Sequence, residues 1–187
     1  MNGIRELTTK RLLLRKPVQK DAELLHRELG CNPEITRYTG WNPYRTPEAA
    51  KEKVLQDIEN NEKPGNYSWI IERDGEAVGT IGAYGYDPDI VSIEIGYSIF
   101  RNAWGYGYAS EAAKRVVKFL IEEEEINRVH AWCHDGNQAS AKVLEHAGLK
   151  QEGLLKQAMR NPDGTLADQR LYGVVKGEFI EAQQFDR

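Results

Sequence analysis

Residues 104–112 read Trp-Gly-Tyr-Gly-Tyr-Ala-Ser-Glu-Ala, and they lie where a β-rich run gives way to a helical one. A turn of small residues that opens a helix exposes several backbone N–H groups, with the helix dipole behind them. Such a turn binds anions, and phosphates above all. Taken alone, the two glycines also fit an ordinary tight turn. If the turn holds a pyrophosphate, the chain uses a nucleotide-bearing cofactor.

Composition limits the function classes. The chain has 187 residues, which is the size of a single domain spanning 1–187, and 40% of them are apolar. The formal net charge is −4 and no Lys/Arg block occurs, so the sequence lacks the electrostatic signature of nucleic-acid binding. A mildly acidic protein favours cationic partners such as amines only weakly.

Two cysteines, Cys31 and Cys133, have no metal-type spacing and form no disulfide framework, so neither a metal nor a disulfide is expected. Cys133 is interpreted as a small buried hydrophobe rather than a nucleophile. The first residues lack the apolar run of a signal peptide, and no 18-residue apolar segment exists. We therefore expect a cytoplasmic protein that does not enter a membrane.

The residue pattern predicts helices interleaved with a mostly antiparallel sheet. Thr46 as N-cap followed by Pro47 is a strong helix start. Residues from 181 on are polar and are predicted to fray. Strands are predicted at 10–16, 67–72, 76–83, 90–100, 128–133, 149–160 and 166–176, and helices at 19–30, 46–60, from the glycine turn to 124, and from 137 to a stop at Gly148.

Three separated segments resemble the GNAT superfamily of N-acetyltransferases, and within it the RimJ/RimL-type group that acetylates the N-termini of ribosomal proteins. Residues 7–15 (LTTKRLLLR) resemble the opening strand L-x-T-x-R-L-x-L-R. Residues 94–99 (EIGYSI) and 104–112 resemble E-[IL]-G-Y-x-[IL] followed by W-G-x-G-Y-A-[ST]-E-A. Residues 137–149 resemble N-x-x-S followed by E-k-x-G-[FL]. Trp104 replaces the Gln/Arg of the wider superfamily, as it does in the RimJ/RimL-type group.

The resemblance implies a fold and a co-substrate. The fold would be α/β (α+β), with a mixed, mostly antiparallel sheet of about seven strands flanked by four helices and splayed in its centre. Acetyl-CoA would be the co-substrate, without a metal. Ile99 would contact pantetheine through its backbone, and Asn137 would contact pantetheine or the acetyl arm, although helix capping alone also explains an Asn there. The pyrophosphate would lie against Trp104, Gly105, Tyr106, Gly107, Tyr108, Ala109 and Ser110.

Two residues are candidates for catalysis. Glu94 is an acid within an apolar β run, so a buried carboxylate with a raised pKa is expected there, and the family often uses such a group to deprotonate the amine. A structural acid paired with a cation or a tyrosine is the alternative. Ser140, one helical turn after Asn137, matches the serine that in the RimJ/RimL-type group is the candidate to protonate or hydrogen-bond the departing thiolate. A small residue for close packing is the alternative for Ser140.

Trp41 and Tyr44 lie on a loop and are predicted to cover the acceptor. An α-amino group has a pKa of roughly 8, so about a tenth of it is neutral at pH 7, whereas a lysine amine costs about 3 kcal/mol more to deprotonate. A site with one base therefore suits an N-terminal amine.

The sequence thus predicts an acetyl-CoA-dependent N-acetyltransferase in which a primary amine attacks the thioester directly. The acceptor is expected to be a protein or peptide N-terminus, a ribosomal protein being one candidate. The alternatives are a small-molecule amine acetyltransferase, acting on a polyamine, an amino sugar or an amino acid, and a non-catalytic acetyl-CoA sensor. The protein is expected to be a monomer or a homodimer.

Overall fold

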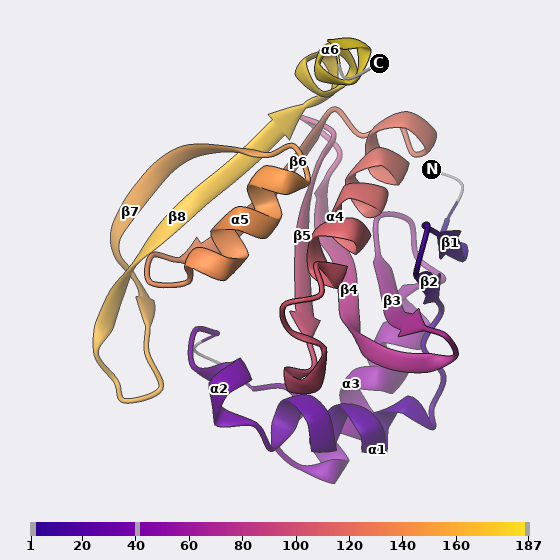
Figure 1. Cartoon of the computed structure of the whole chain (residues 1–187), viewed down its shortest axis with the longest axis vertical. Coiled ribbons are helices and arrows are strands. Elements are labelled where there is room, and N and C mark those ends of the chain that lie inside the picture. The colour runs from indigo at the N-terminus through magenta and orange to yellow at the C-terminus, as the bar shows by residue number, and fades with distance from the viewer. Residues whose placement is uncertain (1–2, 40–41, 186–187) are drawn as a thin grey trace.

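The computed structural model describes residues 3–39 and 42–185, and its strands form one mixed sheet in the order β1-β2-β3-β4-β5-β6-β8-β7 (Figure 1). Neighbouring strands run antiparallel, except that β5 and β6 are parallel. The fold class predicted from the sequence is therefore confirmed. The strands are β1 (Leu7–Thr8), β2 (Leu13–Arg15), β3 (Tyr67–Arg73), β4 (Glu76–Asp87), β5 (Ser92–Ile99), β6 (Arg128–His134), β7 (Lys150–Arg160) and β8 (Leu166–Val175).

The helices lie in the connections and at the end of the described chain. Thr46 caps α3 as predicted, because its side chain accepts a hydrogen bond from the backbone of Ala49. The α-helices are α1 (Asp21–Leu25), α2 (Pro33–Thr36), α3 (Pro47–Asn60), α4 (Tyr108–Lys118), α5 (Gln138–His146) and α6 (Lys176–Phe185). A short π-helix η1 (His26–Gly30) follows α1, a 3₁₀-helix η2 (Arg101–Ala103) precedes the glycine turn, and a second π-helix η3 (Phe119–Glu123) follows α4.

The expected counts of about seven strands and four helices are wrong, since the described chain has eight strands and six α-helices. Strand β1 has two residues and α2 has four, which is too short to produce a periodic pattern. Helix α6 continues to Phe185, although fraying is predicted from residue 181 on. It is held because Phe179, only 4% exposed, reaches the main core and would contact a side chain placed at Gly148.

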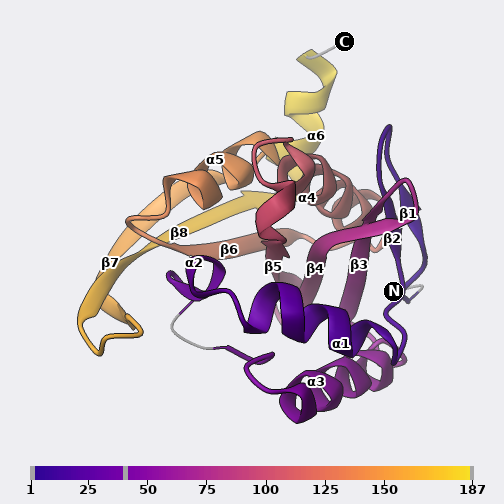
Figure 2. The ribbon, with the colours of Figure 1, turned by 60° about the horizontal axis from the view of Figure 1, so that its bottom comes forward.

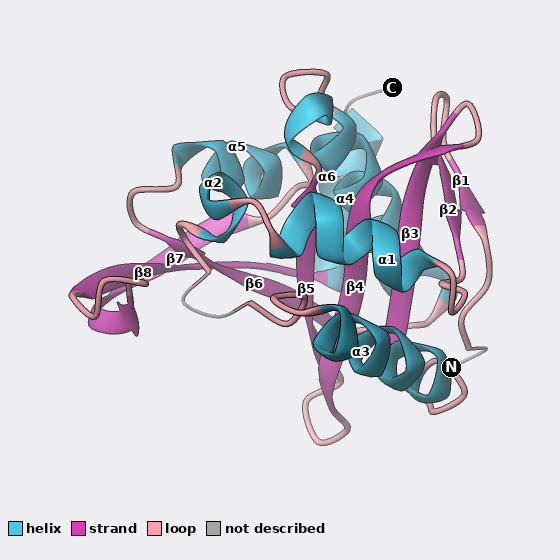
Figure 3. Cartoon of the chain, turned by 90° about the horizontal axis from the view of Figure 1, so that it is seen from below, coloured by secondary structure: helices cyan, strands magenta, loops and turns pink. Residues whose placement is uncertain are grey.

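Helices cover both faces of the sheet (Figures 2 and 3). On one face, α4 and α5 bury Val116, Val117 and Leu144 against strand residues such as Ile93 in the main core. On the other face, α1 and α3 form a smaller core around Leu25, Val54 and Ile70. Strands β7 and β8 form a long hairpin that extends away from this helix layer (Figure 1).

The two central strands pair only at one end. Parallel pairing of β5 with β6 joins Ser92–Glu94 to Arg128–His130, whereas β5 continues to Ile99 and β6 to His134. The predicted splay is thus confirmed. Along β5 the alternation of a strand sends Ile93 and Ile95 into the main core and Glu94 to the opposite face. The fold therefore places Glu94 where the sheet opens.

Candidate active site

The turn before α4 has the backbone that its glycines suggest. Gly105 has φ 83° and Gly107 has φ 78°, a region in which residues with a side chain are strained. Gly107 is also the N-cap of α4, and no side chain caps the helix. The first N–H groups of α4 are therefore left to an external acceptor beside the exposed residues 104–107.

A polar brace holds this turn against the N-terminal segment. The Glu111 carboxylate accepts hydrogen bonds from Thr9 Oγ1 (2.6 Å), from the Arg11 backbone N (3.0 Å) and from Arg11 Nε (2.6 Å). Arg11 Nη1 donates to the carbonyl of Tyr106 at 3.0 Å. Burial opposes ionisation of Glu111, but these hydrogen bonds outweigh it and lower its pKa. Both motif segments contain these residues, yet their sequences alone did not indicate the contact.

Aromatic side chains border the same turn. Trp104 Nε1 donates to the carbonyl of Ile99 at 2.8 Å, and the Arg101 guanidinium lies 4.6 Å from the centre of the Trp104 ring. Tyr106 and Tyr108 stack with their ring centres 5.5 Å apart. One lone pair of the Ile99 carbonyl is therefore already engaged, which leaves the other for a ligand.

A cavity of about 810 Å³ lies between the sheet and the layer formed by α1 and α3. Glu94, Tyr97, Asn137, Ser140 and Tyr44 are among the residues of its wall. The structure thus brings together both predicted catalytic residues, one predicted cofactor residue and one predicted substrate residue. Among the described residues, those of the 104–110 turn are not part of this wall.

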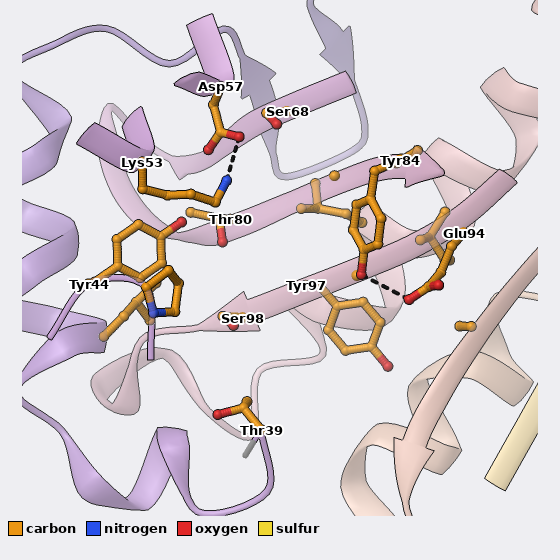
Figure 4. Close-up of a pocket in the computed structure, with 18 of the residues that line it drawn as sticks. Thr39, Tyr44, Lys53, Asp57, Ser68, Thr80, Tyr84, Glu94, Tyr97 and Ser98 are labelled. Atoms are coloured by element: carbon orange, nitrogen blue, oxygen red, sulfur yellow. Dashed lines mark hydrogen bonds and ion pairs between the residues drawn. The ribbon is translucent and has the colours of Figure 1, made fainter. Parts of the chain in front are cut away.

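Glu94 is held by two donors within the cavity wall. Tyr84 donates to Glu94 Oε1 at 3.0 Å (Figure 4). The Trp132 indole donates to Glu94 Oε2, also at 3.0 Å. The side chain of Glu94 remains 27% exposed, so the expectation of a buried carboxylate is wrong. The reason is that Glu94 lies in the wall of the cavity, so its carboxylate faces open space rather than the packed core. Burial and the nearby carboxylate raise the pKa of Tyr84.

His130 is the register partner of Glu94 at the last parallel pair, and its Nε2 lies 4.0 Å from Glu94 Oε2. Burial lowers the pKa of His130 despite the attraction of the carboxylate. A neutral imidazole therefore lies behind Glu94 at neutral pH.

Ser140 and Asn137 open helix α5 on the other side of the splay. Asn137 Oδ1 accepts a hydrogen bond from the Ser140 backbone N–H at 3.1 Å, so Asn137 caps helix α5. Its contact with a cofactor stays a prediction. Tyr97 Oη lies 3.0 Å from Ser140 Oγ and donates to the Ser140 carbonyl at 3.1 Å. The sequence indicated no role for the Tyr97 side chain, because strand alternation does not reveal which helix its ring meets.

The far end of the cavity is polar. Tyr44 lines it, and the Tyr44 carbonyl accepts a hydrogen bond from His26 Nδ1 at 2.7 Å. Lys53 Nζ and Asp57 Oδ1, one helical turn apart on α3, form an ion pair of 2.5 Å in the same wall (Figure 4). Trp41, the other predicted substrate residue, lies outside the described residues.

Cys133 lines the cavity as a buried thiol, and burial raises its pKa to about 11. It is therefore protonated at neutral pH, which does not favour a nucleophilic role. Within residues 3–39 and 42–185, no three His, Cys, Asp or Glu side chains are grouped as metal ligands.

Residues 11–150 match the family model described as an acetyltransferase (GNAT) domain. The chain belongs to the GNAT acetyltransferase family. This GNAT enzyme is 30% identical over 175 residues to an uncharacterized N-acetyltransferase, p20, of Bacillus licheniformis, covering 92% of this chain and 97% of the relative. It is 33% identical over 174 residues to the uncharacterized N-acetyltransferase YoaA of Bacillus subtilis, covering 91% and 96%.

The GNAT fold is also that of a solved structure of RimL, a ribosomal L7/L12 alpha-N-protein acetyltransferase in complex with coenzyme A. The TM-score is 0.84 at 22% identity, covering 91% of this chain and 98% of RimL. In the described part of the enzyme, no helix has both the length and the apolar character needed to cross a membrane.

Proposed function

We propose that this GNAT enzyme transfers an acetyl group from acetyl-CoA to a primary amine, most often a protein or peptide N-terminus. The observation that carries the proposal is that Glu94 and Ser140, from opposite sides of the splay, line one cavity. The proposal treats residues 1–187 as one cytoplasmic domain, monomeric or homodimeric.

The donor fits the residues present. The uncapped start of α4, with exposed glycines at positive φ, offers backbone N–H groups and a favourable dipole to a pyrophosphate. In this proposal Trp104, Tyr106 and Ser110 surround the phosphates, while Ile99 and Asn137 contact the pantetheine arm. Acetyl-CoA supplies the activated thioester, and the protein supplies position, a base and a proton donor.

Glu94 acts as the base. Its carboxylate takes a proton from the acceptor ammonium group, directly or through one water, and the neutral nitrogen attacks the thioester carbon. A backbone N–H between Tyr97 and Ile99 stabilises the oxyanion. The carbon–sulfur bond then breaks while Ser140 Oγ donates a hydrogen bond or its proton to the sulfur. The second proton of the attacking nitrogen passes through water to the thiolate, or back to Ser140 if that has given up its own, so that an amide and the thiol of CoA remain.

The preference for an α-amine has two supports. An α-amine has a pKa of roughly 8, so a partly exposed carboxylate such as Glu94 can deprotonate it at a small free-energy cost. Deprotonating a lysine amine costs about 3 kcal/mol more. RimL, which has the same fold, is a ribosomal L7/L12 alpha-N-protein acetyltransferase. The polar end of the cavity at Lys53 and Asp57 favours the second candidate, a small amine that carries another polar group.

A CoA-release assay over N-terminal peptides and small amines tests the proposal. We expect turnover with peptides that have a free N-terminus and none when that N-terminus is blocked. Turnover confined to small amines would replace the peptide acceptor with the second candidate. Tight binding of acetyl-CoA without turnover of any amine would favour the sensor function and overturn the proposal.

A further inference from the structure

The hydroxyl groups of Tyr97 and Ser140 form a pair inside the splay. Tyr97 comes from β5 and Ser140 from α5, and the two oxygens are 3.0 Å apart. Both residues line the cavity, whereas the Glu94 carboxylate lies on the opposite face of β5 from the Tyr97 ring. The pair therefore lies on the side of the strand away from the proposed base.

We propose that Tyr97 is a positioning residue for Ser140, holding its Oγ so that the serine hydrogen is directed at the sulfur of CoA. This inference rests on the proposed function, in which Ser140 receives the leaving thiolate.

The Tyr97 and Ser140 hydroxyl groups can be hydrogen-bonded in two ways, because either can be the donor. In the first, Tyr97 donates to the Ser140 carbonyl at 3.1 Å and Ser140 Oγ donates to Tyr97. In the second, Tyr97 donates to Oγ and the serine hydrogen is free for another acceptor. A thiolate only accepts hydrogen bonds, so its presence selects the second arrangement.

The backbone of Ser140 is already fixed. Its N–H is bound by Asn137 Oδ1 at 3.1 Å, so the only freedom left is rotation of the side chain. A serine in the first turn of a helix otherwise turns its hydroxyl toward a backbone carbonyl. A hydroxyl turned toward a backbone carbonyl cannot donate to the sulfur of CoA. A hydrogen bond donated by Tyr97 of β5 to Ser140 Oγ favours a side-chain rotation in which the serine hydrogen stays free for the sulfur.

Tyr97 is suited to donate a hydrogen bond without losing its proton. Burial raises its pKa, and the hydrogen bond with Ser140 only partly offsets this effect. The neighbouring titratable groups that affect it are Cys133 on β6 and Tyr172 on β8, and burial raises the pKa of both. All three groups are neutral at neutral pH, so a thiolate there would meet donors and no competing negative charge among them.

The test compares the affinity of CoA with that of desulfo-CoA, which lacks the thiol, by calorimetry from neutral to alkaline pH. Wild-type protein should prefer CoA increasingly as the thiol ionises. The Tyr97→Phe variant keeps the ring and should lose this preference about tenfold, the size of a hydrogen bond to a charged group, while its desulfo-CoA affinity stays unchanged. Ser140→Ala should lose the preference as well, and Tyr97→Phe should then have no further effect.

Tyr172→Phe is the matched control, because Tyr172 is buried and its hydroxyl contacts Glu145 and Gln151 instead of Ser140. Incorporation of 3-fluorotyrosine at position 97, a more acidic phenol of similar size, should strengthen the preference. If Ser140→Ala abolishes the preference while Tyr97→Phe leaves it intact, the inference is wrong and the proposed function stands. If wild-type protein binds no CoA, or Ser140→Ala changes nothing, the proposed role of Ser140 fails and the inference fails with it.

Discussion

The turn at the start of α4 and the cavity beside Glu94 are built in different ways. The turn consists of nine consecutive residues, braced by Arg11 and Glu111, and its glycines have the φ angles that the sequence suggests. The described wall of the cavity comes from loops, from four α-helices (α1, α2, α3 and α5) and from several strands. In the proposed function the turn binds the pyrophosphate of CoA, which is the same in every reaction, and consecutive residues suffice to form it. The proposed acceptor site instead needs residues from distant segments of the chain. The following experiments separate the two regions.

The largest effect is expected at the carboxylate of the cavity. Glu94→Gln keeps the shape but removes the proton acceptor, so we expect acetyl transfer to fall about 100-fold, as for the loss of a general base. CoA affinity, measured by calorimetry, should stay within about twofold, because the turn is unchanged. Glu152→Gln, which removes a carboxylate paired with Arg128 outside the cavity wall, is the control. A Glu94→Gln variant with wild-type turnover would rule out the base.

The next effect concerns the turn and has a closely matched control. Gly105 and Gly75 have φ values of 83° and 84°, and an added Cβ would meet nothing within 4 Å at either position. Alanine at each should therefore cost about 1–2 kcal/mol in the free energy of unfolding. Only Gly105→Ala should also weaken CoA binding, by about tenfold, since its methyl group would lie beside the pyrophosphate. Equal CoA affinities for both variants would mean that the turn holds no phosphate.

The brace gives a pH-dependent prediction. The pKa of Glu111 is lowered in the folded protein, so its ionised form stabilises the fold above the unfolded pKa, and this stabilisation is lost as the pH falls through the folded value. Glu111→Gln should therefore cost about 1–2 kcal/mol above about pH 5. Denaturant unfolding at several pH values should show the difference from wild type shrinking at lower pH. A difference that is constant with pH would show that the carboxylate charge does not hold the brace.

The smallest effect is expected at the polar end of the cavity. Lys53→Met and Asp57→Asn should change the KM of an accepted amine by about threefold, with little change in kcat. The reason is that, if the acceptor fills the cavity, its distal part reaches these groups, and an i,i+4 pair contributes little to stability. Lys51→Met, on the exposed side of α3, is the control. Identical KM values for all three variants would show that the acceptor does not reach this end.

The same contrast explains what could be predicted from the sequence. The turn, the helix start at Thr46 and the central strands follow from local chemistry, and they were predicted correctly. A tyrosine partner for Glu94 was the alternative that the sequence offered, and Tyr84 is one. Which tyrosine it is, and the second donor Trp132, were not predicted, because they reach Glu94 only through the register of β4 and the position of β6. The exposure of Glu94 likewise depends on which part of the sheet the helices leave open. A role that depends on contact between side chains far apart in the sequence therefore cannot be predicted without the tertiary structure.

The early end of pairing between β5 and β6 has one more consequence. Beyond Glu94 and His130 the two strands present backbone edges to each other inside the sheet, whereas β1 and β7 are its outer edges. An outer edge can be joined by any strand of another protein, which is a hazard for aggregation. The inner edge between β5 and β6 is enclosed by α4, α5 and the neighbouring strands. It therefore has room only for a narrow ligand whose own amide groups can pair with the strand, such as a pantetheine arm. The unpaired backbone groups of β5 and β6 are thus available to a ligand but not to the strands of other proteins.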